Sequence, residues 1–169
     1  MPSIDNSNKH LDLGCGDHAR NPYSAPELYG VDLSLGDREA DDNFKTCNLV
    51  CEPIPFSDAF FASVSAFDVI EHIPRQSVDH ERKIIVNPFI LVMNEIHRVL
   101  KPNGLFYALT PAYPSPEAFQ DPTHVNIITE GTHQYFCGDN ADAKRYGFIG
   151  KFKVIEAQRI YPKYAQTAE

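Results

Sequence analysis

The chain has 169 residues, of which 43% are hydrophobic, and its formal net charge is −8 at pH 7. This length predicts one domain over residues 1–169, large enough to bury a core without disulfides or metals. The negative charge and the lack of a Lys/Arg cluster argue against a nucleic-acid partner. No apolar run approaches the roughly 20 residues of a membrane span. No signal peptide is visible, so we expect no membrane partner and a cytoplasmic location.

The first half of the chain predicts short strands separated by loops. We expect strands at residues 9–13, 28–32 and 44–49. Between the first two, the prolines of residues 17–27 predict a stunted or irregular crossover. The polar, acidic stretch 34–43 predicts a loop or a single helical turn.

The next segments predict the rest of a sheet and its covering helix. Residues 60–67 predict a strand, and residues 75–86, charged and then aliphatic, predict a helix. The clearest helix is 88–100, where apolar residues recur at spacings of three and four. Residues 105–110 predict the following strand. Strands that alternate with helices predict an α/β fold with a doubly wound, mostly parallel sheet.

The character of the sequence changes after residue 110. Residues 111–128 are rich in proline and aromatic groups. We expect a helix at 129–137 and a final strand at 152–161. No further strand can be placed, so we expect shortened N- and C-terminal ends of the sheet.

Residues 10–16 read His-Leu-Asp-Leu-Gly-Cys-Gly, an apolar strand that ends in two glycines. Gly14 and Gly16 allow the backbone to turn sharply and to approach a ligand. Asp32 ends the next predicted strand, where an acid commonly binds the hydroxyls of a ribose. Together these features predict a nucleoside-binding site.

The charge around this loop separates two classes of cofactor. Residues 14–19 satisfy the relaxed dinucleotide pattern G-x-G-x-x-G/A. A dinucleotide would place its pyrophosphate on the loop, where Asp12 and Asp17 would repel it. S-adenosylmethionine (SAM) carries a cationic sulfonium and an ammonium group and no phosphate, so the acids favour SAM. A nicotinamide-dependent oxidoreductase stays open as an alternative.

The four cysteines are Cys15, Cys47, Cys51 and Cys137, and without a secretory signal we expect them to be reduced thiols. Cys47 and Cys51 lie four residues apart, but no second pair of Cys or His follows at zinc-finger spacing. We therefore expect no zinc site, and the predicted reaction requires no metal ion.

Six segments, in order, resemble the class I SAM-dependent methyltransferases of the small-molecule type. They are Leu11–Gly16, Gly30–Leu33, Cys47–Leu49, Ile54–Phe56, Phe67–His72 and Glu95–Gly104. The resemblance implies a Rossmann-like methyltransferase fold with SAM as cofactor. It places the SAM-binding half at about 9–110 and the acceptor-side segment at about 111–169.

The resemblance also implies roles for residues of the glycine loop and the second strand. Gly14 and Gly16 would lie beneath the methionine part of SAM, with Cys15 between them in the loop. Asp12 would help to hold the loop and reach the ammonium through water. Asp32 would accept both ribose hydroxyls.

The remaining implied cofactor residues surround the adenine. Leu33 would pack on the adenine, and Leu49 would form its second apolar wall. Asn48 stands where the family often has an acid for the adenine amino group, and its amide oxygen can still accept that bond. Ala66 and Phe67 would line the pocket after the fourth strand.

Two groups of residues are candidates on the acceptor side. His124 could take a proton from a hydroxyl or amine, with Asp121 to orient it. Alternatively, Asp121 starts an Asp-Pro turn and His124 bonds to the backbone. Glu71 and His72 follow the fourth strand, as a catalytic pair or as groups that cap the next turn.

These features predict methyl transfer from SAM to an oxygen or nitrogen of a small molecule, such as a sugar or an amine metabolite. The family usually has a helix before the first strand that covers the active site, and this chain begins almost at the strand. We therefore expect the lid to be missing or to come from the second subunit of a homodimer. The alternative is a SAM-binding regulatory or structural module without catalysis.

Overall fold

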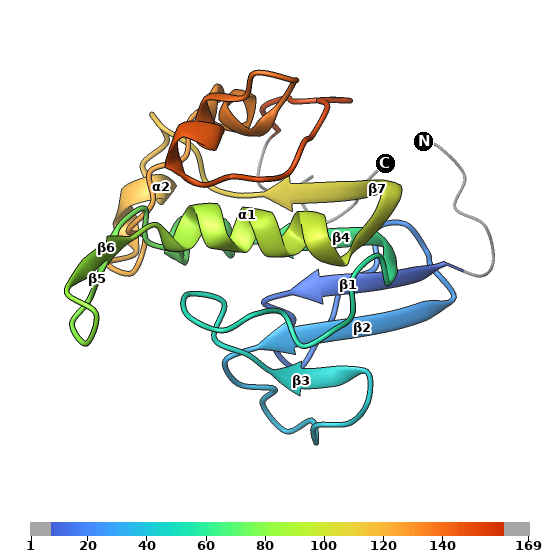
Figure 1. Ribbon diagram of the computed structural model, residues 1–169. Coiled ribbons are helices and arrows are strands. Elements are labelled where there is room, and N and C mark those ends of the chain that lie inside the picture. The colour runs from blue at the N-terminus through green and yellow to red at the C-terminus, as the bar shows by residue number, and fades with distance from the viewer. Residues whose placement is uncertain (1–7, 161–169) are drawn as a thin grey trace.

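The computed structural model describes residues 8–160, and its centre is a parallel sheet in the order β3-β2-β1-β4-β7 (Figure 1). The strands are β1 (Lys9–Leu13), β2 (Glu27–Asp32), β3 (Phe44–Thr46), β4 (Phe61–Phe67) and β7 (Leu100–Leu109). All four neighbouring pairs are parallel. The chain moves outward from β1 to β3 and then crosses back to β4. The structure thus confirms the Rossmann-like α/β class.

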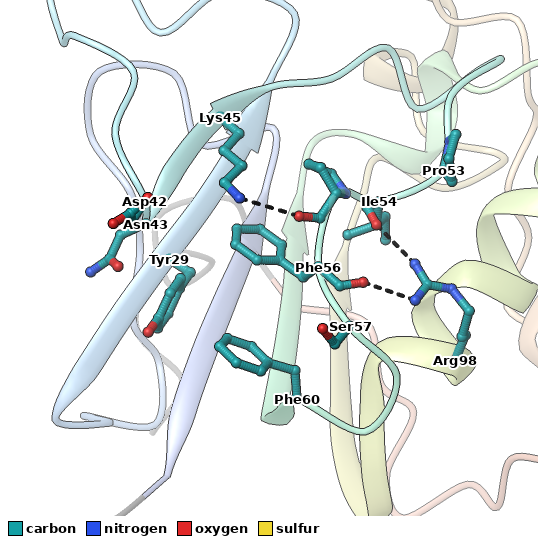
Figure 2. Close-up of a pocket in the computed structure, with 11 residues that line it drawn as sticks. Tyr29, Asp42, Asn43, Lys45, Pro53, Ile54, Phe56, Ser57, Phe60 and Arg98 are labelled. Carbon is teal, nitrogen blue, oxygen red and sulfur yellow. Dashed lines mark hydrogen bonds between the residues drawn. The ribbon is translucent and has the colours of Figure 1, made fainter.

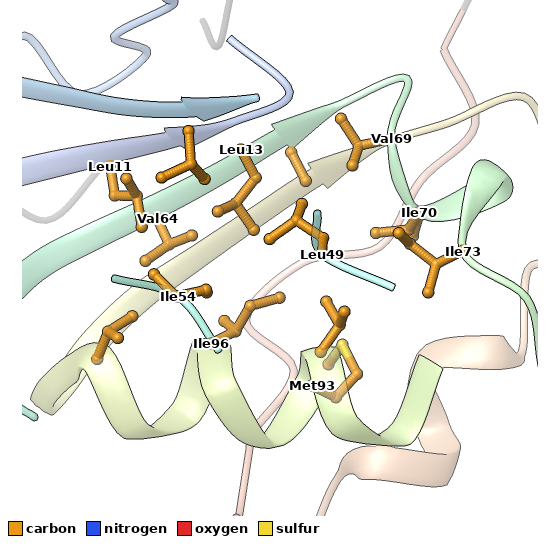
Figure 3. Close-up of a cluster of buried hydrophobic side chains, with 14 of the residues drawn as sticks. Leu11, Leu13, Leu49, Ile54, Val64, Val69, Ile70, Ile73, Met93 and Ile96 are labelled. Carbon is orange, nitrogen blue, oxygen red and sulfur yellow. The ribbon is translucent and has the colours of Figure 1, made fainter. Parts of the chain in front are cut away.

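Helix α1 (Pro88–Val99) covers one face of the sheet, as its apolar periodicity predicts (Figure 1). Its inward residues include Val92, Met93 and Ile96, all buried. In Figure 3, Met93 and Ile96 lie on the side of α1 that faces Leu11 of β1 and Val64 of β4. Burial of these side chains, at about 25 cal/mol per Å² of apolar surface, makes this layer the main core of the described residues.

The opposite face of the central strands carries a buried polar network. The His10 ring lies 2.8 Å from the Ser63 hydroxyl through Nδ1 and 2.9 Å from the Ser65 hydroxyl through Nε2. Ser65 in turn donates to Asp12 Oδ1 at 2.6 Å. These four residues alternate with the core residues of β1 and β4, because side chains of a strand alternate between its two faces. The central strands therefore bury apolar side chains on one face of the sheet and polar side chains on the other.

The segment 17–26 covers this polar network without forming a helix, as its two prolines predict. The backbone N–H of Arg20 donates to Asp12 Oδ2 at 2.7 Å. The ring of Tyr23 packs edge-on to His10, with centroids 5.9 Å apart. The loop thereby fixes the chain just after the glycines.

The predicted helix at 75–86 is wrong, because these residues form the hairpin of β5 (Ser77–Asp79) and β6 (Ile84–Val86). Asp79 Oδ1 accepts the N–H groups of Glu81 and Arg82 at 3.1 and 2.9 Å. Lys83 has a φ of 57°. A side-chain-capped turn of this kind competes directly with a helix.

The last part of the described chain is mostly irregular. It holds α2 (Glu117–Gln120), followed by two 3-10 helices, η2 (Thr132–Phe136) and η3 (Asp142–Tyr146). A third 3-10 helix among the described residues, η1 (Ile70–His72), lies earlier, after β4. The helix predicted at 129–137 is thus only the 3-10 turn η2.

The strand predicted at 152–161 is also wrong over its described residues. Only an isolated bridge joins Phe152 to Cys137 there, and residue 161 lies outside the described part. The third strand is shorter than predicted and ends at Thr46. Within residues 8–160, no helix has the length and apolar character to cross a membrane.

Candidate functional site

The glycine loop leaves β1 at the carboxyl edge of the sheet, where α/β folds bind their ligands. The N–H groups of Gly14 and Cys15 both donate to the carbonyl of Val31, at 2.8 and 3.2 Å. Gly14 has a φ of +67°, and a Cβ there would lie 2.2 Å from Cγ2 of Val69. Only glycine fits this position, because the backbone is left-handed and the space is filled.

Asp32 meets the same loop from the end of β2. Its Oδ2 accepts the N–H of Gly16 at 2.9 Å, and its Oδ1 accepts the N–H of Ser34 at 3.0 Å. Each carboxylate oxygen keeps a further acceptor site for a hydroxyl group. Among residues 8–160, no atom lies within 4 Å of the Cβ that a side chain at Gly16 would have. The loop is thus open where a ligand would meet Asp32.

The end of β3 brings the predicted adenine residues to this edge. The N–H of Cys47 donates to the Asp32 carbonyl at 2.8 Å, so the turn after β3 lies beside Asp32. Asn48 Oδ1 caps that turn by accepting the N–H of Val50 at 3.1 Å. Leu33 is 69% exposed, whereas Leu49 is buried in the core. Leu33 is the apolar group of this pair that a planar base could cover.

Two predicted pocket residues on β4 are buried under other groups. Ala66 is fully buried in the core that faces α1. Phe67 packs against Tyr107, with ring centroids 5.3 Å apart. The guanidinium of Arg20 lies 4.7 Å from the Phe67 ring centroid, and this cation beside the loop was not found from the sequence. The one available signal was its position four residues after Gly16.

Asp12 supports the loop from below. It is 2% exposed, and its two oxygens accept the Ser65 hydroxyl and the Arg20 N–H. Burial raises the pKa of Asp12 to about 6. Cys15 is buried against Phe44, and burial raises the pKa of its thiol to about 11. A protonated, enclosed thiol is a packing group and not a nucleophile.

On the acceptor side, the structure places His124 Nε2 3.8 Å from Asp121 Oδ2. Asp121 Oδ1 also accepts the N–H and the hydroxyl of Thr123, at 2.7 and 2.6 Å. The Thr123 hydroxyl bond is the main cause that lowers the pKa of Asp121. The Asp-Pro turn and the His–Asp pair are therefore both present.

Two further candidates adjoin this pair. The rings of His72 and His124 pack edge to face, with centroids 4.7 Å apart. Glu71 is 1% exposed, and burial raises its pKa. In the sequence, Glu71 and His72 form one candidate pair, and Asp121 and His124 form a separate one. The structure joins them into one cluster.

A surface hollow of about 550 Å³ lies elsewhere (Figure 2). Tyr29, Lys45, Phe56, Phe60 and Arg98 are among its lining residues. Phe60 immediately precedes β4, so the hollow lies toward the amino ends of the strands. Because the glycine loop leaves the carboxyl end of β1, this hollow is not the nucleoside site.

Comparisons with known proteins agree with this geometry. Residues 1–136 match the model of a family described as a methyltransferase domain. Among curated proteins, none is significantly similar in sequence. A Haloferax volcanii methyltransferase, solved in complex with the activator Trm112, is 19% identical with a TM-score of 0.55; the match covers 79% of this chain and 60% of that one.

Two further solved structures match with lower TM-scores. YcgJ of Bacillus subtilis is 22% identical with a TM-score of 0.49, and the match covers 72% of this chain and 56% of YcgJ. A SAM-dependent methyltransferase of Mesorhizobium loti is 18% identical with a TM-score of 0.46, covering 66% of this chain and 49% of that one. The chain thus spans about half to three fifths of the length of these structures. By its family match and its sheet order, the chain belongs to the class I SAM-dependent methyltransferases.

Proposed function

We propose that this chain transfers the methyl group of SAM to an oxygen or nitrogen atom of a small molecule, such as a sugar hydroxyl or an amine metabolite. The observation that carries the proposal is the Asp32 carboxylate beside the open backbone of Gly16. It offers acceptors for a ribose at the point where a glycine loop leaves room for the rest of the nucleoside.

In this proposal, the residues at about 9–110 bind SAM. Asp32 accepts the ribose hydroxyls, and Leu33 and Asn48 border the adenine. Gly14 and Gly16 lie beneath the methionine part, with Cys15 between them. The proposal also gives cofactor-binding roles to Asp12, Leu49, Ala66 and Phe67. Asp12 acts through its bond to the Arg20 backbone, because its carboxylate is buried.

SAM supplies an electrophilic methyl group when it is bound. The chain then has to hold the acceptor atom about 3 Å from that methyl, in line with the sulfur. The acceptor-side segment, from about residue 111 onward, brings His124 and Asp121 to the end of β4. His124, oriented by Asp121, would accept the proton that a hydroxyl or amine loses.

Calorimetry with SAM, S-adenosylhomocysteine and NAD tests the cofactor half of the proposal. We expect SAM and S-adenosylhomocysteine to bind and NAD not to bind, and a preference for NAD would overturn the assignment. Transfer is tested with methyl-labelled SAM and a panel of sugars, amines and other small hydroxyl compounds. Binding without transfer to any acceptor would instead support a SAM-binding module that lacks catalysis. Sedimentation of the same sample tests the expected homodimer.

A further inference from the structure

The side chain of Glu71 is buried without a partner. It lies in η1, directly after β4, and is 1% exposed. Neither of its carboxylate oxygens has a hydrogen-bond partner among the described residues. Burial of an ionised carboxylate is strongly unfavourable unless a cation or several donors compensate for its charge. The Glu71 carboxylate therefore needs either a proton, as its raised pKa indicates, or a bound cation.

Two imidazole rings stand beside this carboxylate. One ligand atom each from Glu71, His72 and His124 lies within 4.8 Å of the other two. In a tetrahedral zinc site with bonds of about 2.0–2.2 Å, the ligand atoms lie about 3.3–3.6 Å from one another. Small rotations of the three side chains would thus bring them around a single ion.

In each ring one nitrogen faces a protein oxygen, which leaves the other nitrogen available as a ligand. His72 Nδ1 lies 3.2 Å from the Thr123 carbonyl, which can only accept, so Nδ1 carries the proton and Nε2 keeps its lone pair. His124 Nε2 faces Asp121 Oδ2 at 3.8 Å. His124 Nδ1 is buried with no hydrogen-bond partner in the described chain. Orientation by a carbonyl or carboxylate at the far nitrogen is characteristic of metal-binding histidines.

Asn126 fixes the two segments that carry the cluster. Its backbone N–H donates to the Glu71 carbonyl at 2.8 Å, and its side-chain amide donates to the Ile70 carbonyl at 3.0 Å. Arg75 Nε donates to Asn126 Oδ1 at 2.7 Å. The turn after β4 and the segment that holds His124 are therefore joined independently of any ion, and the ligand set is organised in advance.

We propose that Glu71, His72 and His124 bind one divalent transition-metal ion, with Zn²⁺ as the best match. Two imidazoles and one carboxylate suit this class of ion, and the same ligand set occurs in catalytic zinc sites. Three protein ligands leave at least one coordination position for an external oxygen. The cysteine spacing could not predict this site, because none of its ligands is a cysteine.

The ion changes the role of His124 in the loaded protein, and this step rests on the proposed function. A nitrogen that binds a metal cannot also accept a proton. The ion would instead lower the pKa of an acceptor hydroxyl or water bound at its open position. The acceptor class thereby narrows to oxygen nucleophiles.

Metal titration of the untagged full-length protein tests the site without any assay of methyl transfer. Protein stripped with a chelator is titrated with ZnCl₂ by calorimetry and with CoCl₂ by visible absorption. We expect one ion per chain and a cobalt spectrum without sulfur charge-transfer bands. Absence of binding by the wild-type protein, or a sulfur-type spectrum, would overturn the proposal.

Three variants identify the ligands: Glu71→Gln, His72→Ala and His124→Ala. Each should weaken binding by more than the roughly 10- to 100-fold that loss of an outer hydrogen-bond partner costs. The matched controls His80→Ala and Cys51→Ser, both at exposed positions, should bind as the wild type does. Should Glu71→Gln fail to fold by circular dichroism, His72→Ala carries the test, because His72 is partly exposed.

Titration of S-adenosylhomocysteine into the same samples separates this proposal from the proposed function. Nucleoside binding without metal binding would overturn only the ion site. The opposite result is a wild-type protein that binds the metal but not S-adenosylhomocysteine, with metal binding abolished in the three variants. It would support the ion site and overturn the proposed function. Metal binding that survives all three substitutions would show that the ion lies elsewhere.

Discussion

The carboxylate of Asp32 accepts the backbone N–H of Gly16 at 2.9 Å, and this bond joins the end of β2 to the loop after β1. The bond holds the loop before any ligand arrives. It also fixes the carboxylate, so the acceptors that a ribose needs are already oriented. Asp32 thus has a structural role and a binding role that substitutions can separate.

Asp32→Ala should weaken SAM binding by a few kcal/mol at most, since hydrogen bonds to a charged acceptor contribute roughly 1.5–3 kcal/mol. Asp32→Asn retains an oxygen that can accept from Gly16 and should recover part of the loss. Calorimetry with SAM measures both. Asp37→Ala removes an exposed acid from the next loop and serves as the control. Unchanged affinity in Asp32→Ala would place the ribose elsewhere.

The two loop glycines should respond differently to alanine. Gly14→Ala should destabilise the fold strongly, because its Cβ would lie 2.2 Å from Val69 Cγ2 at a φ of +67°. Gly16→Ala meets no described atom within 4 Å, so only the left-handed backbone costs it about 1–2 kcal/mol. We expect this variant to fold and yet to bind SAM at least about tenfold more weakly, a loss of about 1.4 kcal/mol. Urea denaturation and calorimetry measure the two effects.

Gly138→Ala is the matched control for Gly16→Ala. Its φ is +85°, and again no described atom lies within 4 Å of the added Cβ. The loss of folding stability should be similar, because the backbone strain is of the same kind. SAM affinity should not change. Equal losses of affinity in both glycine variants would point to a general effect of strain and not to contact with the cofactor.

The polar network predicts two opposing pH effects on stability. Burial raises the pKa of Asp12 from 3.8 to about 6, so its stabilising contribution is present below pH 4 and is lost as the pH rises to 6. Burial lowers the pKa of His10 from 6.5 to about 4, so its contribution is present above pH 6.5 and is lost as the pH falls to 4. In the wild-type protein, the two effects should largely offset one another between pH 4 and 6.

Substitution of either residue should reveal the pH effect on stability that the other residue contributes. Relative to the wild type, the free energy of unfolding of Asp12→Asn should rise with pH between 4 and 6, by up to about 1.4 kcal/mol per pH unit. For His10→Gln, the difference should have the opposite sign. Urea denaturation at pH 4, 5, 6 and 7 measures the slopes. Parallel curves for all three proteins would contradict the assigned shifts.

Arg98 should contribute strongly to stability through the loop before β4. Its guanidinium donates to the carbonyls of Ile54 and Phe56, each at 2.8 Å (Figure 2). It also pairs with Glu95 and Asp58. Arg98→Lys keeps the charge and loses the fork of donors.

We expect Arg98→Lys to lower the free energy of unfolding by about 1–3 kcal/mol and to leave SAM affinity unchanged. Arg82→Lys is the control, because the Arg82 side chain is 78% exposed and should change stability by less than about 0.5 kcal/mol. Chemical denaturation compares the two variants. A similar small effect in both would contradict the role of Arg98.

The sequence allowed the central layer to be predicted because its signals are local. The apolar run of β1 ends at glycines, and the apolar stripe of α1 repeats over three turns. The hairpin 77–86 was missed because the turn at Asp79 depends on side-chain bonds to two backbone N–H groups. Its composition of charged and then aliphatic residues suits a helix equally well.

More of the candidate cofactor site than of the acceptor side could be predicted from the sequence. Gly14, Gly16 and Asp32 lie on adjacent strand ends, and parallel strands bring such ends to one edge. Glu71 and His124 belong to segments that meet only after the chain has passed through α1 and β7. No spacing rule relates them, so their proximity depends on tertiary packing alone.

The difference between the two faces of the sheet affects which alignment of the strands is stable. His10 and Asp12 pair with hydroxyls of β4, while their neighbours Leu11 and Leu13 enter the core. A shift of β1 against β4 by a single position would drive an imidazole and a carboxylate into hydrocarbon and leave two leucines among the serine hydroxyls. A misaligned pairing of β1 with β4 is therefore unfavourable on both faces of the sheet, so the buried polar layer helps to select the correct strand alignment.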